Sequence, residues 1–170
     1  HVSASGPPVH SLTTPRSMAT HMKFPSNDDR PEVMLHWYHA QKGPEILRKH
    51  GLSAGGNNTL FIGSEGMLLC GFSKRKLLPE AKFKGVTLAV KKVANSPGFY
   101  REWTAAIRGG GPATCHFDYS GPLTEAVLLG NVAYRAGGEG FGWDHKTLTV
   151  TGNPRASGLI KPAFRAGWQV

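Results

Sequence analysis

The chain has 170 residues, of which 39% are hydrophobic and 18% charged, which suits one folded domain with a sizeable core and is short for two. No apolar run is long enough to span a membrane, so no membrane partner is expected. The formal net charge of +9 raises the question of nucleic acid, but the positive residues of the middle are not interleaved with aromatic side chains. They are Lys74, Arg75, Lys76, Lys82, Lys84, Lys91 and Lys92. A solvated basic surface is favoured over nucleic-acid binding.

The first third of the chain reads as strands. "HVSASGPPV" alternates loosely, and "SMATHMKFP" places Met18, Thr20, Met22 and Phe24 on one face. "PEVMLHWYHA" follows the polar turn "SNDDRP", which predicts a hairpin. Within this second strand, Val33, Leu35, Trp37 and His39 share one face, and Met34, His36 and Tyr38 share the other.

The next segment contains an excursion and a clear hairpin. "QKGPEILRKHGLSAGGNN" predicts a long loop with a short helix at 44–50. In "TLFIGSEGMLLCG", two apolar runs flank a tight turn with glycines that can take positive φ. Because the runs are apolar on both faces, we expect this hairpin to be central in its sheet. Residues 74–92 show only a weak, basic pattern.

The last third of the chain contains start and stop signals for two helices. Ser96 can cap a helix with Pro97 at its first position and an apolar stripe formed by Phe99, Trp103, Ala106 and Ile107. A second helix is expected to start at Gly121-Pro122, to be buried on most sides, and to end at Gly137 and Gly138. "FGWDHKTLTVTG" predicts a terminal strand pair. Strands first and helices late indicate an α+β domain, with a mostly antiparallel open sheet carrying helices on one face.

The sequence does not support a metal site, a dinucleotide-binding site or a hydrolase active site. His36 and His39 point to opposite faces of a predicted strand and cannot hold one metal ion together. "GGEGFG" follows a helix and precedes a strand, the wrong order for a dinucleotide cradle, so this chain has no predicted cofactor site of its own. No G-x-S-x-G elbow and no persuasive acidic pair occurs, so no catalytic residue is assigned. The two cysteines lack metal-type spacing and slightly favour a reducing compartment.

An aromatic and polar set is the remaining candidate. Its members are Trp37, Tyr38 and His39 on a strand, and Phe117, Asp118 and Tyr119 before a helix. One interpretation is structural, with half-buried aromatic rings and an aspartate that favours the helix dipole. The other is a sugar platform, with aromatic faces against C–H groups and polar groups on hydroxyls. Glu125, one turn into a mostly apolar helix, is expected to be a hydrogen-bond anchor rather than a catalytic acid.

Six segments in order resemble one family. "FDYSGPLTEAVLLGNVAYRAG" resembles the late helix of the Gfo/Idh/MocA oxidoreductases, in the bacterial branch abundant in planctomycetes and Bacteroidetes. "EVMLHWYHA" resembles that branch's L-x-W-Y-D-G strand, and "TLFIGSEGMLLCG" its G-x-x-F-x-G-x-x-G-x-L hairpin. "SPGFYREWTAAIRGG", "FGWDHKTLTVTG" and "FRAGWQV" follow in the expected order. No single motif is diagnostic, but six in order are specific.

The resemblance implies a two-domain enzyme. An N-terminal Rossmann domain would bind NAD or NADP, and residues 1–170 would be most of the C-terminal domain, which supplies the substrate wall and the oligomer interface. The family's catalytic lysine, in an E-K-P motif, and a G-D-M-G-x-H motif both belong before His1. The implied parent is an NAD(P)-dependent oxidoreductase acting on a sugar or sugar derivative, and this chain alone would be catalytically inactive.

One residue departs from the branch pattern. His39 stands where the branch usually has Asp, which puts in doubt a substrate role carried over to this position. Two alternatives remain open: a domain of an NAD-dependent glycosidase of the same superfamily, and a non-enzymatic carbohydrate-binding or oligomerisation module. Substrate identity, the choice of NAD or NADP, and a cytoplasmic or periplasmic location also remain open.

Overall fold

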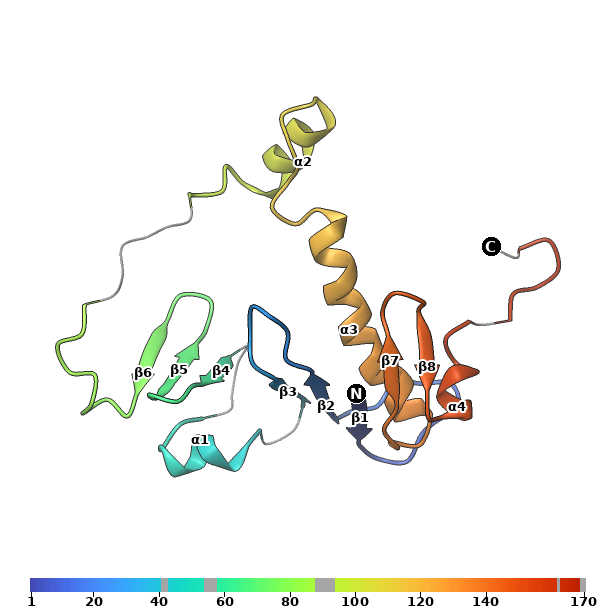
Figure 1. Ribbon diagram of the computed structural model, residues 1–170, viewed down its shortest axis with the longest axis horizontal. Coiled ribbons are helices and arrows are strands. Elements are labelled where there is room, and N and C mark those ends of the chain that lie inside the picture. The colour runs from blue at the N-terminus through green and yellow to red at the C-terminus, as the bar shows by residue number, and fades with distance from the viewer. Residues whose placement is uncertain (41–42, 54–57, 88–93, 162, 169–170) are drawn as a thin grey trace. The chain divides into compact units, whose positions relative to one another are not determined.

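The computed structural model describes residues 1–40, 43–53, 58–87, 94–161 and 163–168. The chain groups into two compact units, His1–Gln41 with Ala105–Val170 and Lys42–Thr104 (Figure 1). The fold is α+β with antiparallel strands, as predicted, but the described strands form three separate sheets rather than one. The second unit accounts for one of these sheets, so each unit is described by itself.

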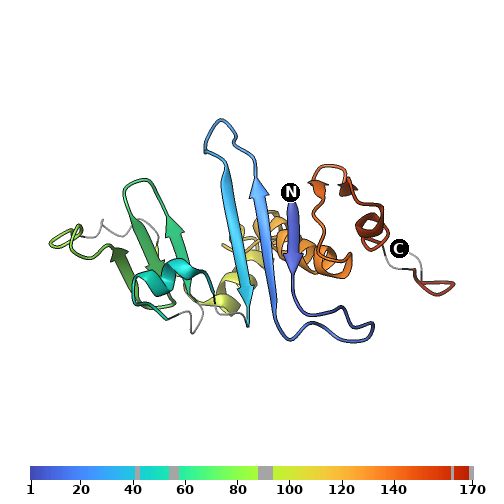
Figure 2. The ribbon, with the colours of Figure 1, turned by 90° about the horizontal axis from the view of Figure 1, so that it is seen from below.

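The first unit is built on a three-stranded antiparallel sheet of β1 (Val2–Ser5), β2 (Met18–Phe24) and β3 (Val33–His39), in that order. Figure 2 shows the three strands side by side. The predicted hairpin between β2 and β3 is confirmed, and its turn is closed by backbone hydrogen bonds between Asn27 and Arg30. On β2, Met18, Thr20 and Met22 are buried, because they face the helix that covers the sheet.

The covering helix is α3 (Phe117–Arg135), which packs on β1 and β2. Its buried residues all lie in its C-terminal half and are Leu129, Gly130, Ala133 and Tyr134. Gly130 lets the helix approach the sheet closely, because a Cβ there would lie 2.7 Å from Thr20 Oγ1. The Tyr134 hydroxyl donates to the carbonyl oxygens of Pro7 and Pro8 at 2.9 and 3.2 Å. The N-terminal strands and this late helix therefore share one core.

Two expectations for α3 are wrong. The helix begins at Phe117 and not at Gly121, and Pro122 lies inside it. Pro122 removes one hydrogen bond to the preceding turn, a cost this helix accommodates near its start. The helix is also not buried on most sides, because Leu123, Val127 and Leu128 in its first two-thirds are exposed. Only the part that lies over the sheet loses its contact with water.

A small terminal motif completes the first unit. The predicted strand pair is confirmed as β7 (Gly142–Asp144) and β8 (Thr149–Thr151), followed by α4 (Pro154–Ser157). The side chain of Asn153 caps α4 by accepting from the Ala156 N–H at 3.0 Å. Phe141, almost fully buried, exchanges two backbone hydrogen bonds with Val2, which ties this motif to β1.

The second unit contains α1 (Glu45–Lys49) and an antiparallel sheet of β4 (Thr59–Ile62), β5 (Met67–Cys70) and β6 (Arg75–Leu78). The short helix and the β4–β5 hairpin are confirmed. The expectation that the whole hairpin is central is wrong, because β4 lies at the edge and exposes Phe61 and Ile62. β6 was not predicted, because residues 74–92 show only a weak, basic pattern.

Helix α2 (Phe99–Ile107) contains the boundary between the units. Ser96 Oγ accepts from the Gly98 N–H at 3.0 Å in the turn before the helix. Because α2 begins at Phe99, the prediction that Ser96 caps it with Pro97 at its first position is wrong. The predicted apolar stripe is present but uncovered: Phe99 is 85% exposed, Trp103 63% and Ile107 68%. Gly109 and Gly111, after the helix, both have positive φ, as expected of residues that stop it.

Candidate substrate-binding site

The predicted site residues of β3 lie on two faces of the sheet. Trp37 is paired with Thr20 and His39 with Met18, so both lie on the α3 side. Trp37 is nevertheless 52% exposed, because α3 covers β1 and β2 and leaves β3 largely bare. Tyr38, paired with Ala19, is half-buried on the opposite face. Trp37 and His39 can therefore line one surface together, and Tyr38 cannot join them.

Asp118 and Tyr119 lie in the first turn of α3, away from the buried part of that helix. The Asp118 side chain is 98% exposed and stands 3.6 Å from His116 Nδ1, while Tyr119 is exposed. The acid lies at the helix end where a negative charge is favoured. No hydrogen bond or ion pair within the described residues joins this turn to Trp37, Tyr38 or His39.

Glu125 has the partner that its position requires. Its Oε1 accepts from Trp143 Nε1 on β7 at 2.5 Å, at a partly buried site. The prediction of a hydrogen-bond anchor is confirmed. The contact fixes the position of β7 against α3.

One histidine pair was missed by sequence reasoning. His21 on β2 and His36 on β3 are direct cross-strand partners, and their Nδ1 atoms lie 2.6 Å apart. Partial burial, and then the charge of His36, lower the pKa of His21 below its ordinary value. The sequence held a signal for this pair, because both histidines stand equally far from the Asn27–Arg30 turn of the predicted hairpin.

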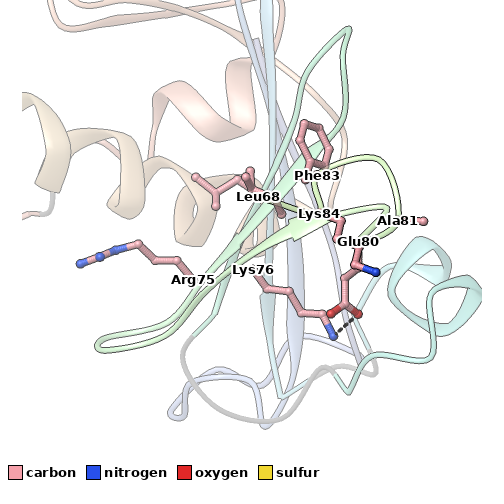
Figure 3. Close-up of a pocket in the computed structure, with 8 residues that line it drawn as sticks. Leu68, Arg75, Lys76, Glu80, Ala81, Phe83 and Lys84 are labelled. Carbon is pink, nitrogen blue, oxygen red and sulfur yellow. Dashed lines mark ion pairs between the residues drawn. The ribbon is translucent and has the colours of Figure 1, made fainter. Parts of the chain in front are cut away.

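The second unit has a hollow of about 560 Å³ on the β5–β6 side of its sheet, drawn in Figure 3. Its apolar lining comes from Leu68, Leu77, Ala81 and Phe83, and its charged lining from Arg75, Lys76, Glu80 and Lys84. Lys76 Nζ lies 2.6 Å from Glu80, whereas Arg75 extends away from that pair. The Lys76–Glu80 pair is neutral, so Arg75 and Lys84 leave the lining with an excess of positive charge. The hollow therefore favours anions weakly. Of the predicted basic set, Lys91 and Lys92 lie outside the described residues.

The described part of the chain contains no group of three or more His, Cys, Asp or Glu side chains arranged for a metal ion. Within the same residues, no helix is long and apolar enough to cross a membrane. Cys70 and Cys115 are free thiols. Asp144 stabilises the β7–β8 turn, where the Lys146 N–H and then Thr147 hold the pKa of its carboxyl below the ordinary value. No family model, no curated protein and no solved structure matches this chain.

Proposed function

We propose that this chain is the C-terminal substrate-binding and oligomerisation part of a nicotinamide-dependent, sugar-type oxidoreductase resembling the Gfo/Idh/MocA enzymes. The order of six motifs along the chain supports the proposal. In the parent enzyme a separate Rossmann domain holds NAD or NADP, and hydride passes between a sugar carbon and the nicotinamide. The cofactor supplies the redox chemistry, and these residues orient the sugar.

The observation that carries the proposal is the exposure of Trp37. Trp37 lies on the edge strand β3, on the α3 side of the sheet, and is 52% exposed. Here its ring lies open beside Leu35 and His39 on the same face. A flat aromatic surface next to a hydrogen-bonding imidazole suits the C–H faces and hydroxyls of a sugar. Asp118 and Tyr119 belong to the proposed substrate wall on the resemblance alone.

Sugar binding by the purified chain tests the proposal. Saturation-transfer NMR with a panel of neutral, amino and acidic monosaccharides should show transfer from the protein for at least one of them. Trp37→Ala should abolish that signal, because it removes the aromatic face. Trp168→Ala, which changes another exposed tryptophan, should leave it intact. Absence of transfer for every sugar, or equal transfer in both variants, would contradict the proposed site.

A cofactor titration tests the division of labour. NADH and NADPH fluorescence should be unchanged by this chain, since the nucleotide site belongs to the separate domain. Saturable binding at micromolar concentrations would overturn the domain assignment, even if sugar binding were observed. Net turnover of added NAD by the parent enzyme would distinguish an oxidoreductase from the NAD-dependent glycosidase alternative.

A further inference from the structure

His21 and His36 meet on the face of the β1–β3 sheet opposite α3. In the strand register, His21 is paired with Ser3 of β1 on one side and with His36 of β3 on the other. The ring centroids are 4.9 Å apart at an interplanar angle of 66°, so the rings meet edge to face. The pairing of the strands thus holds the two Nδ1 atoms together.

The short contact restricts protonation of the pair. Two ring nitrogens 2.6 Å apart can form a hydrogen bond only when one carries a proton and the other presents its lone pair. Protonating both would place two donors and two positive charges against each other. When neither Nδ1 carries a proton, both lone pairs face the space between the two rings. A small rotation of each ring would direct both at one transition-metal ion, which imidazole binds through an unprotonated nitrogen.

We propose that the Nδ1 atoms of His21 and His36 together bind one divalent transition-metal ion of the nickel or copper type. The site stands apart from Trp37, which lies on the opposite face of the same hairpin. It is therefore independent of the proposed sugar surface.

The separation of the two nitrogens decides between metals. Metal–imidazole bonds of about 2.0–2.1 Å place two nitrogens about 2.9 Å apart at a right angle and about 3.4 Å apart at a tetrahedral angle. From 2.6 Å, adjacent positions of a square-planar or octahedral ion need a movement of about 0.3 Å, whereas tetrahedral zinc needs more than twice that. In the general order of affinity for divalent metal ions, copper ranks above both nickel and zinc.

The surroundings leave room for the remaining ligands. His36 is exposed and His21 is half-buried, so water can complete the coordination shell. Tyr38 lies beside His21 with ring centroids 6.4 Å apart. Lys23, the cation on this face of β2, is paired with Glu32 at 2.9 Å, which offsets its repulsion of a metal ion.

The test is a Ni²⁺ titration of the untagged chain, followed by calorimetry and by ¹H–¹⁵N NMR. One ion should bind per chain in the micromolar range. Paramagnetic broadening should centre on the amides of His21, His36 and their neighbour Ser3. His21→Gln and His36→Gln should each weaken binding at least tenfold. A Zn²⁺ titration should give weaker binding at the same site.

Two matched variants separate this pair from other surface histidines. His39→Gln changes a histidine on the same strand but the other face, and His1→Gln removes the terminal imidazole. Both should bind Ni²⁺ within twofold of the unchanged chain. The proposal is overturned by absence of binding, by broadening centred elsewhere, or by equal affinity in all four variants.

Discussion

Single residues fix the distance between α3 and the sheet. Gly130→Ala would place a methyl group 2.7 Å from Thr20 Oγ1 and 2.9 Å from its Cγ2, at a site where Thr20 is almost fully buried. We expect a loss of about 1–3 kcal/mol in the free energy of unfolding, as for other overpacked cores. Urea denaturation followed by circular dichroism measures it.

Gly121→Ala is the matched control on the same helix. A Cβ at Gly121 meets nothing within 4 Å, so the change adds no clash with the sheet. Pro122 restricts the residue before it and offsets the gain in helix propensity, so the free energy of unfolding should change by less than about 1 kcal/mol. Destabilisation of equal size at both positions would show that close packing at Gly130 is not the cause.

The Trp143–Glu125 hydrogen bond is the second residue-scale contact with a measurable effect. Trp143→Phe keeps a ring but removes the donor, leaving a partly buried carboxylate oxygen without its partner. A loss of about 1–3 kcal/mol is expected. A double-mutant cycle with Glu125→Leu should recover part of the loss, because the unpaired acceptor is then gone. Strict additivity of the two changes would refute a direct coupling.

The β2–β3 hairpin carries the pH dependence expected at the scale of an element. Since burial and His36 lower the pKa of His21, the unfolded chain takes up a proton more readily than the folded one near the ordinary value of 6.5. The free energy of unfolding should therefore fall as pH drops through 6.5, and the loss is complete below the folded pKa. Urea midpoints at pH 7.5 and 5.0 measure it.

His36→Gln provides the comparison for this pH dependence. It removes the neighbouring charge and leaves His21 in place, so the drop in urea midpoint between the two pH values should shrink. An unchanged drop would assign the effect to other titrating groups.

Elements with regular alternation could be predicted from sequence, and elements that depend on distant packing could not. The faces of β2 and β3 could be predicted, because period-two patterns and a polar turn specify a hairpin locally. The edge position of β4 and the exposure of Leu123 could not be predicted, because an apolar run does not reveal which other elements cover it. In the candidate site, side chains alternate along a strand, so the sequence predicts that Trp37 and Tyr38 lie on opposite faces of the sheet. The meeting of His21 with His36 needed the register.

At the scale of the whole molecule, the uncovered stripe of α2 bears on the expected oligomer. Phe99, Trp103 and Ile107 form an apolar surface on one helix, and such surfaces on soluble proteins commonly serve as contact sites. Light scattering coupled to gel filtration should give a mass above that of one chain. Trp103→Glu should lower that mass, because it places a charge in the stripe.

Arg101→Glu, on the same helix but outside the stripe, should leave the mass unchanged. A monomeric mass for the unchanged chain at high concentration would contradict self-association. Equal effects of the two variants would show that charge, rather than loss of the apolar surface, controls assembly.

The hydrogen bonds from Tyr134 to Pro7 and Pro8 join segments that leave the ribosome far apart in time. The apolar side of the β1–β3 sheet is completed only when α3 and Phe141 have been synthesised, after all of residues 42–104. During translation the apolar side of the first strands stays uncovered until α3 is made, while the second unit can already fold through its own local contacts. Biosynthesis therefore reverses the order of the sequence, with the unit encoded in the middle maturing before the one that begins the chain.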